Sequence, residues 1–208
     1  NSEVKSFYLP RKAVSVACLQ NCYIAVDETG EAFESRQKEP LEFSRIYELP
    51  KIVDISGTFY HCIVVCKDYR VFVRGSSSIG SLGLGQNVKE AKQFTEIESL
   101  RKYKITSVYA GYNHSLFQTK EGKILACGYN IYGQLLLDSF GNKVYYPVET
   151  SVESGASFCI AGKNASAVFI GNEIPDKIPN KKIKWNNDST TTTITTSPKS
   201  DSNSKTKL

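Results

Sequence analysis

Short apolar runs separated by polar turns occupy most of the chain and predict β-strands. The runs are rich in β-branched and aromatic residues, and clusters of Gly, Asn, Asp or Lys bound them. The clearest are CIVVC (62–66), YRVFV (69–73), ILAC (124–127) and SAVFI (166–170). No window holds a sustained apolar stripe of helical period. Residues 89–103 have moderate helical character, and we expect them to form a loop between repeats.

Two stretches, residues 52–84 and 105–137, share one pattern. In each, an apolar run leads to a Gly, then a His, then a second apolar run, a turn and a third run that ends in Gly. The two histidines, His61 and His114, lie 53 residues apart, and a Gly follows each of them 14 residues later. Two landmarks that keep one period indicate a repeated supersecondary unit.

Weaker copies flank these two. In residues 14–33, Cys22 precedes the turn glycine Gly30 by eight residues, which is the spacing from His114 to its turn glycine. Residues 154–171 form a fourth copy. There we expect a shortened hairpin at residues 162–164, with Gly155 and Phe158 in the places of the Gly and the His.

Four-stranded units repeated at this spacing are typical of a β-propeller. We therefore expect an all-β fold in residues 1–180, a partial β-propeller of about four blades built from 40–55-residue repeats. The expected repeat units lie near residues 13–36, 52–85, 105–137 and 152–171.

The third unit carries the most specific motif. It reads Ala110-Gly111-Tyr112-Asn113-His114-Ser115, then Glu121-Gly122, Cys127-Gly128-Tyr129-Asn130 and Tyr132-Gly133-Gln134-Leu135. This unit resembles the repeat of the regulator of chromosome condensation family, although Leu136 stands where that family usually has Gly. The repeat-defining residues that the resemblance makes structural are Gly57, His61, Gly75, Gly80, Gly111, His114, Gly122, Gly128, Gly133 and Gln134.

The family's propeller has seven blades, so the resemblance implies an incomplete ring here. The chain begins at Asn1 and contains no Met, which we interpret as a fragment or as a product that needs a second half. An open ring leaves sheet edges without a partner, and such edges favour self-association.

Candidate chemistry is sparse, and we expect no enzyme, no cofactor and no metal. His61 and His114 occupy the same repeat position, so we interpret both as buried residues that bond to backbone across a blade. The pair Cys62 and Cys66 is four residues apart, which on a strand is about 13 Å and too far for one ion. The spacing from Gly75 to Gly80 matches a phosphate loop, but the Lys of that motif is missing.

The cysteines and the charge suggest where the protein acts. Six cysteines lie mostly in apolar strand contexts, which fits a reducing cytoplasm or nucleus. The net charge is +5, and residues 181–208 supply +4 of it from six Lys and two Asp. This Ser/Thr/Lys-rich tail is expected to be disordered. Its lysines are a weak signal for nuclear import or nucleic-acid binding, and Ser197-Pro198 is a weak signal for phosphorylation.

Three functions remain open at this stage. The preferred hypothesis is a protein-interaction propeller that acts as a scaffold or regulator. The second is a guanine-nucleotide exchange factor for a small GTPase, which works by differential binding and needs no nucleophile. Its contacts would come from the loops at residues 86–104 or 138–147. The third is a chromatin- or nucleic-acid-associated module that uses the basic tail. None of the three involves a membrane.

Overall fold

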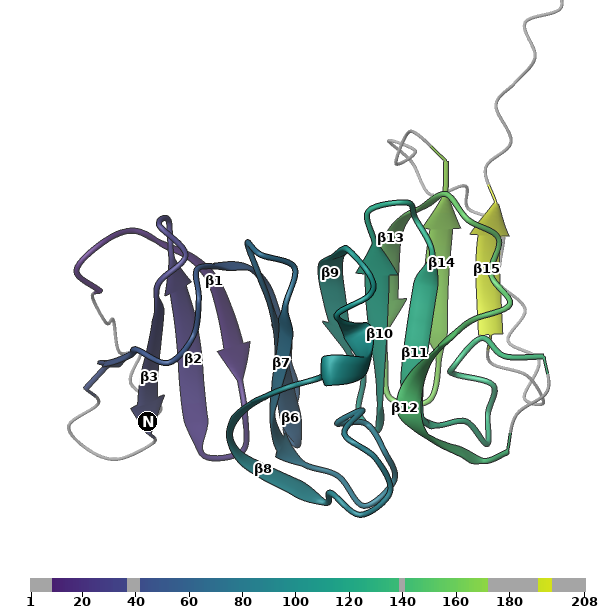
Figure 1. Cartoon of the computed structure of the whole chain (residues 1–208), viewed down its shortest axis with the longest axis horizontal. Helices are drawn as coiled ribbons and strands as arrows, with labels where there is room; N and C mark the ends of the chain where they lie inside the picture. The colour runs from purple at the N-terminus through teal and green to yellow at the C-terminus, as the bar shows by residue number, and fades with distance from the viewer. Residues whose placement is uncertain (1–8, 37–41, 139–140, 172–190, 196–208) are drawn as a thin grey trace, which may run out of the picture.

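The computed structural model describes residues 9–36, 42–138, 141–171 and 191–195. Within these residues the fold is all-β, with 15 strands and one short 3-10 helix. The strands form four sheets that follow one another in chain order across an arc (Figure 1). We call these sheets blades 1 to 4. The prediction of a partial β-propeller of about four blades is confirmed.

Blades 1 to 3 each contain four antiparallel strands whose spatial order follows the chain. Blade 1 has β1 (Ala13–Cys18), β2 (Cys22–Asp27), β3 (Ala32–Arg36) and β4 (Ser44–Ile46). Blade 2 has β5 (Ile52–Gly57), β6 (His61–Cys66), β7 (Val71–Ser76) and β8 (Glu90–Glu96), followed by the helix η1 (Glu98–Leu100). Blade 3 has β9 (Ile105–Ala110), β10 (His114–Thr119), β11 (Ile124–Tyr129) and β12 (Lys143–Glu149). Blade 4 has β13 (Ala156–Ala161), β14 (Ser166–Ile170) and β15 (Thr191–Thr195).

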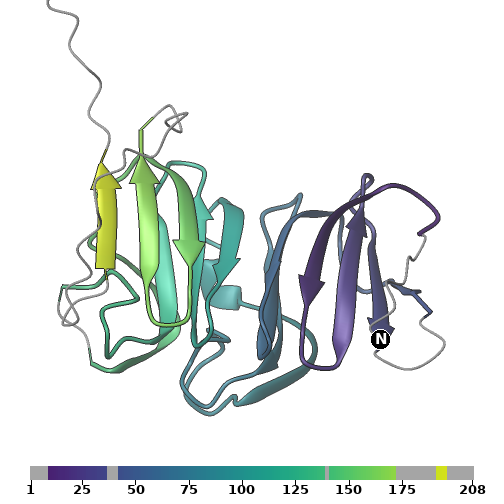
Figure 2. The same cartoon turned by 180° about the vertical axis from the view of Figure 1, so that it is seen from behind.

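The blades pack face to face, and an apolar core fills each of the three junctions. Strands β6 and β10 are buried at every position, because each is the second strand of a blade that is covered on both faces. The junction cores contain Ile24 and Val64 between blades 1 and 2, Ile63 and Phe117 between blades 2 and 3, and Leu116 and Val168 between blades 3 and 4. Blades 1 and 4 lie at opposite ends of the arc, so the described residues do not close a ring (Figures 1 and 2).

The two strongest repeats have the same strand register. His61 on β6 lies opposite Gly75 on β7, and His114 on β10 lies opposite Gly128 on β11. Because both landmarks occupy one cross-strand pair, the 14-residue spacing seen in the sequence is the length of one hairpin. Gly57 lies one position earlier than Gly111 in this register, so that Thr58 takes the place of Gly111.

The expectation of a loop with helical character at residues 89–103 was wrong. Most of this segment is the fourth strand of blade 2, β8, and only η1 is helical. The segment expected to be a loop at residues 138–147 likewise contains the start of β12. Strand β8 has mostly polar residues, EAKQFTE, and lacks the apolar run that marks the inner strands.

The fourth unit begins later than we expected. In β13 and β14, Ala161 pairs with Ser166, as Ala110 pairs with Ser115 in blade 3. The turn at residues 162–164 is therefore the first turn of a blade, and Ala165 occupies the position of the histidine. The match of Gly155 and Phe158 to the Gly and the His was wrong, because blade 4 has lost the His that would have set the register.

The segment expected to be a disordered tail includes β15, which pairs in parallel with β14. The other tail residues, with Lys181, Lys182, Lys184 and Ser197-Pro198, lie outside the described residues.

The change Gly128→Val should lower the free energy of unfolding by about 1–3 kcal/mol or more. A Cβ atom at Gly128 would lie 2.4 Å from the Asn113 carbonyl oxygen and 2.6 Å from the Cα of His114, at a φ of +113°. Urea unfolding should show the loss. The matched control is Gly141→Val, because a Cβ there meets nothing within 4 Å. Equal stability of the two variants would contradict the packing of Gly128 against the histidine hairpin.

Candidate interaction surface

The two histidines lie in the junctions between blades and are fully buried. His61 Nε2 lies 2.8 Å from the hydroxyl of Ser115 in blade 3, and His114 Nε2 lies 2.8 Å from the hydroxyl of Ser166 in blade 4. The expected partner was backbone, but the structure has a serine hydroxyl of the next blade in this place. Each serine directly follows the histidine position of its own blade.

The serine hydroxyls determine the tautomer of the rings. Ser115 Oγ donates to the carbonyl oxygen of Ser81, and Ser166 Oγ donates to that of Gln134, both at 2.7 Å. Because each hydroxyl proton is used in this way, the hydroxyl oxygen must accept from the ring, and Nε2 carries the hydrogen. One serine thus joins two elements of the preceding blade, the strand with the histidine and the loop after its third strand.

These rings are poor candidates for acid–base chemistry. Burial lowers the pKa of His61 to about 3, with a smaller effect from His114, and it lowers the pKa of His114 to about 4. Both rings are therefore neutral near pH 7. Within the described residues, neither Nδ1 atom has a hydrogen-bond partner. We assign both histidines to the junctions rather than to a reaction site.

Most of the other repeat-defining residues also lie at junctions or beside the histidines. Gly57, Gly80 and Gly122 approach atoms of the adjoining blade, and Gly75 lies against the backbone of His61. Gly111 lies against the ring of His114. Gly133 is in the turn that leads to Gln134, whose side chain is buried and accepts from the Tyr132 N–H.

The cysteines do not form a metal site in the described residues. No group of three or more His, Cys, Asp or Glu side chains is placed there to hold an ion. All six cysteines are free thiols, and five are buried. Burial raises the pKa of the Cys66 and Cys159 thiols to about 12, so both are protonated and unreactive near pH 7. In this part of the chain, no helix is long and apolar enough to cross a membrane.

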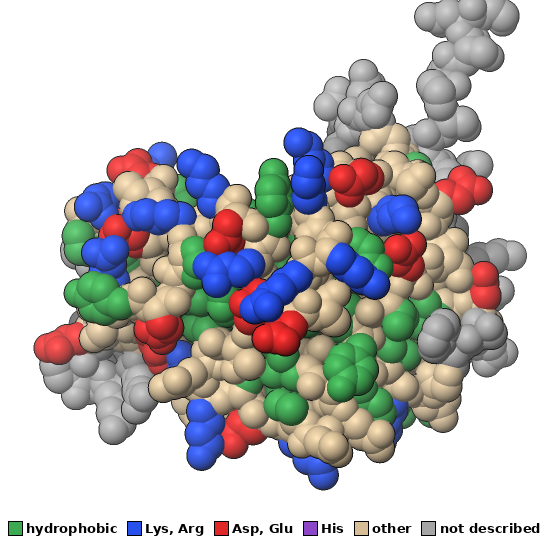
Figure 3. Space-filling view, viewed as in Figure 1, with side chains coloured by type: hydrophobic (Ala, Val, Ile, Leu, Met, Phe, Trp, Pro, Cys, Tyr) green, Lys and Arg blue, Asp and Glu red, His purple; other side chains and the backbone are tan. Residues whose placement is uncertain are grey.

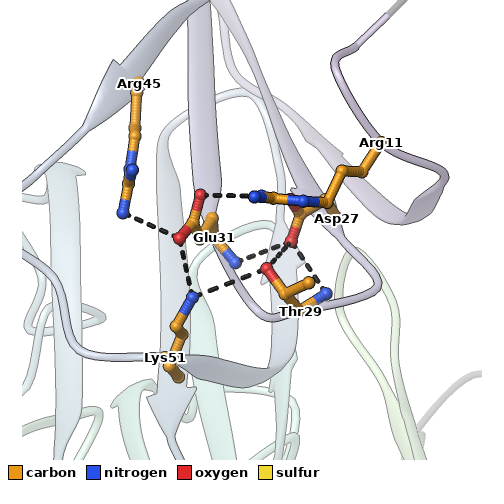
Figure 4. A network of polar contacts seen from close by, with 6 residues as sticks. All are labelled: Arg11, Asp27, Thr29, Glu31, Arg45 and Lys51. Atoms are coloured by element: carbon orange, nitrogen blue, oxygen red, sulfur yellow. Dashed lines mark hydrogen bonds and ion pairs between the residues drawn. The ribbon is translucent and has the colours of Figure 1, made fainter.

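One end of the blades is a charged rim, which consists of the turns after each second strand and the segments that enter each blade. In blade 1, the Glu31 carboxylate receives Arg11 at 3.1 Å, Arg45 at 2.8 Å and Lys51 at 2.7 Å (Figure 4). The neighbouring Asp27 accepts from Arg11 at 3.2 Å. One carboxylate therefore joins three cations. Arg11 and Arg45 come from two segments of blade 1, and Lys51 comes from the segment that enters blade 2.

Further ion pairs lie elsewhere on the rim. Glu96 receives Arg101 at 2.6 Å beside η1, and Asp68 receives Arg70 at 2.9 Å. In Figure 3, basic and acidic side chains alternate around η1. Paired charges at an exposed surface add little to stability.

The opposite end of the blades carries a turn ridge, which we define as residues 19–21, 58–60, 111–113 and 162–164. These are the turns between the first and second strand of each blade. Hydrogen bonds join each turn to the next, so the ridge crosses all four blades without a break. They run from the Gln20 N–H to the Phe59 carbonyl, from the Thr58 hydroxyl to the Gly111 carbonyl, and from the Tyr112 N–H to the Gly162 carbonyl.

Aromatic side chains cover the middle of the turn ridge. The rings of Tyr60 and Tyr112 meet edge to face with centroids 4.9 Å apart, and their hydroxyls lie 2.9 Å apart. Phe59 packs against Tyr60 and is 51% exposed. The Lys163 ammonium lies 5.6 Å from the centroid of the Tyr112 ring. These contacts hold large apolar surfaces in one orientation while leaving them open to solvent.

A hollow of about 250 Å³ adjoins the turn ridge between blades 1 and 2. Its lining includes two aromatic residues and three charged ones, Phe59, Tyr60, Arg74, Glu90 and Lys92. Arg74 is fixed there by two hydrogen bonds to Glu34, at 2.7 and 2.9 Å. The sequence signal for this surface is an aromatic residue shortly before each histidine, Tyr60 and Tyr112.

Comparison with known proteins agrees with the geometry. A family model described as "Regulator of chromosome condensation (RCC1) repeat" matches residues 105–134. The yeast RCC1 protein Prp20 has a similar fold in two crystal structures. One contains Prp20 bound to Kap60, with a TM-score of 0.67 and 16% identity over 79% of this chain and 43% of the other. The second, of Prp20p from Saccharomyces cerevisiae, has the same TM-score and 17% identity, and covers 80% and 45%.

Curated relatives match over shorter stretches. The "Secretion-regulating guanine nucleotide exchange factor" of Mus musculus is 33% identical over 96 residues, which is 46% of this chain and 20% of that protein. The "Probable E3 ubiquitin-protein ligase HERC4" of Homo sapiens is 33% identical over 97 residues, or 47% and 9%. The chain thus spans a fifth or less of these relatives. The fold defines a β-propeller repeat protein. One of its repeats, at residues 105–134, matches the regulator of chromosome condensation repeat.

The change Ser166→Ala should cost about 1–3 kcal/mol of unfolding free energy, because it leaves the His114 N–H and the Gln134 carbonyl buried without a partner. Ser157→Ala is the control, since its exposed hydroxyl makes one bond, to the Phe169 carbonyl. Thermal melts should separate the two variants by several degrees. Similar melts would show that the histidine–serine contact does not stabilise the junction.

Stability should fall in acid through Asp27. Burial acts to raise the pKa of this carboxyl, but bonds from the Thr29 hydroxyl, two backbone N–H groups and Arg11 outweigh it and lower the pKa from 3.8 to about 2. A lowered pKa stabilises the fold above the ordinary value, and this contribution disappears as pH falls toward about 2. The urea midpoint of wild type should therefore exceed that of Asp27→Asn at pH 7 and approach it at about pH 2.

Asp68→Asn supplies the control for acid stability, because Asp68 lies on the same rim with 45% of its side chain exposed. Its midpoint should stay near that of wild type at both values of pH. A gap between wild type and Asp27→Asn that did not narrow in acid would contradict the role of the Asp27 charge.

Proposed function

We propose that this chain is a non-catalytic protein-binding module, and that its partner docks on the turn ridge. The observation that carries the proposal is the exposed cluster of Phe59, Tyr60 and Tyr112, held by contacts between blades. Aromatic side chains that are rigid before binding lose little entropy in an interface and are enriched among the residues that dominate affinity.

The distribution of exposed apolar side chains favours this end of the blades over the charged rim. Of 13 large apolar side chains that are exposed in the described residues, five lie in turns and loops at the ridge end, five lie on the first strands of the blades, two lie on the charged rim and one lies on β12. The five at the ridge end are Phe59, Val88, Tyr112, Ile131 and Tyr132. An apolar area with polar groups at its margin is the usual composition of a protein interface.

The alternative is that the chain belongs to a guanine-nucleotide exchange factor for a small GTPase. It is favoured by the name of the mouse relative, of which the chain covers 20%. Exchange requires only that the propeller bind the nucleotide-free GTPase more tightly than the loaded form. The third hypothesis, a chromatin-associated module, depends on tail lysines that lie outside the described residues. Free thiols in the described part support a cytoplasmic or nuclear location.

Affinity capture from lysate tests the proposal with two matched variants. Phe59→Ala combined with Tyr112→Ala removes the exposed aromatic surface, whereas Tyr47→Ala removes a 79% exposed ring from the charged rim. A direct partner should bind at least tenfold more weakly to the double variant, because truncated aromatic anchors cost about 2 kcal/mol or more. Binding to Tyr47→Ala should equal that of wild type, and purified components should reproduce the difference by titration.

Two capture conditions separate the hypotheses. One lysate contains EDTA, which strips GTPases of nucleotide, and the other contains magnesium and GTP. A GTPase captured only with EDTA would support an exchange factor. Partners that are insensitive to the treatment and lost with the double variant would support a scaffold. Full binding to the double variant would refute the turn ridge as the docking surface.

A further inference from the structure

The first strands of the blades form an inner wall along one edge of the arc. In each sheet β1, β5, β9 and β13 occupy the same edge, and β5 and β9 contact each other across the junction, as do β9 and β13. A groove of about 490 Å³ runs over β5, β9 and the start of β13. It is distinct from the turn ridge, which consists of turns, whereas the groove is lined by strand residues.

Asp54 is the only charged side chain on these four strands, all of which the structure describes. It lies in the groove and is partly buried. Its Oδ1 accepts from the Ile55 N–H at 2.9 Å, and its Oδ2 accepts from the Val108 N–H at 3.0 Å. Within the described residues, no Lys, Arg or His forms an ion pair with it. Each carboxylate oxygen therefore keeps acceptor capacity for a further donor.

The need to satisfy backbone N–H groups does not explain a charge at this position. Two residues further along β5, the hydroxyl of Ser56 accepts from the Ala110 N–H at 2.9 Å. A neutral hydroxyl can therefore accept from a backbone N–H of β9 as well as a carboxylate does. Burial raises the pKa of Asp54, although the two backbone hydrogen bonds partly oppose this, so the ionised carboxylate is held at a cost that a nearby cation would offset.

The rest of the groove suits a planar cation. The ring of Phe158 is 41% exposed and meets Tyr109 edge to face at 5.8 Å, which leaves an aromatic surface at one end. Side chains with hydroxyl groups line the floor and can accept or donate hydrogen bonds. They are Ser56, Thr106, Ser107 and Ser157.

We propose that this inner groove binds an arginine side chain of a polypeptide partner, with the guanidinium on the Asp54 carboxylate and its plane near Phe158. A guanidinium has five donors in a planar fork that matches a carboxylate, and it stacks on aromatic faces. A lysine ammonium can lie over an aromatic ring, but it is a compact charge without the planar fork. Since the carboxylate lies in a partly desolvated groove with no competing charge on the wall, its field is weakly screened.

The test uses a labelled pentapeptide, Ala-Ser-Arg-Ser-Ala, titrated with the full chain at low ionic strength and followed by fluorescence anisotropy. Matched peptides carry citrulline, which keeps the shape without the charge, or lysine in place of arginine. The protein variants are Asp54→Asn, which keeps an acceptor oxygen, and Asp68→Asn, which removes one charge from the distant rim.

The arginine peptide should bind wild type and Asp68→Asn equally. The citrulline and lysine peptides, and Asp54→Asn with the arginine peptide, should bind at least tenfold more weakly. Affinity of wild type should also fall as pH is lowered through the pKa of Asp54, and this profile tests the proposal even if Asp54→Asn folds poorly. Equal binding of arginine and citrulline peptides, full binding by Asp54→Asn, or no binding of the arginine peptide would overturn it.

This proposal does not depend on the turn ridge. The double variant at Phe59 and Tyr112 leaves every residue of the groove in place, so it should bind the arginine peptide as wild type does. Loss of peptide binding in that variant would show that the peptide lies on the ridge, and it would overturn the assignment to Asp54.

Discussion

A single serine hydroxyl in each of two junctions is the interaction on which the arrangement of the blades depends. Ser115 of blade 3 accepts from His61 and donates to the carbonyl of Ser81, and both of these partners belong to blade 2. Ser166 repeats this arrangement one blade later. A buried imidazole and a buried carbonyl would each cost free energy without a partner, and one hydroxyl satisfies both. Packing of the apolar cores can tolerate small shifts between blades, but these hydrogen bonds tolerate far less, so they fix the angle between the blades at these two junctions.

The sequence was most informative where the same environment recurs. His61 and His114 keep their spacing to a following glycine because each pair faces across one hairpin, and a change in hairpin length would break the register. The serine partner was harder to find, since a Ser next to a His has many explanations until the next blade is in place. Blade 4 lacks the histidine that marks the repeat in blades 2 and 3. With Ala165 at the histidine position, only strand pairing could align the unit, and the register inferred from Gly155 was wrong.

The outer strands and the surfaces resisted prediction for a different reason. Strand β8 has solvent on its outer side, so its residues are mostly polar and no periodic apolar signal marks it. The turn ridge depends on which turn lies beside which. Phe59 and Tyr112 are more than 50 residues apart in the chain, and only the stacking of blades 2 and 3 brings the ring of Tyr112 against Tyr60 and its neighbour Phe59.

The histidines and serines that recur cannot by themselves select a partner, because the two junctions that contain them use them in the same way. Selectivity must then come from positions that differ among the blades. Phe59 and Lys163 flank the shared tyrosine pair on one surface, and Asp54 is the single charge on the other. The repeat thus supplies a rigid frame, and we expect recognition to depend on the residues that depart from the repeat. A search for function in a protein of this kind should therefore begin with the residues that its repeat does not explain.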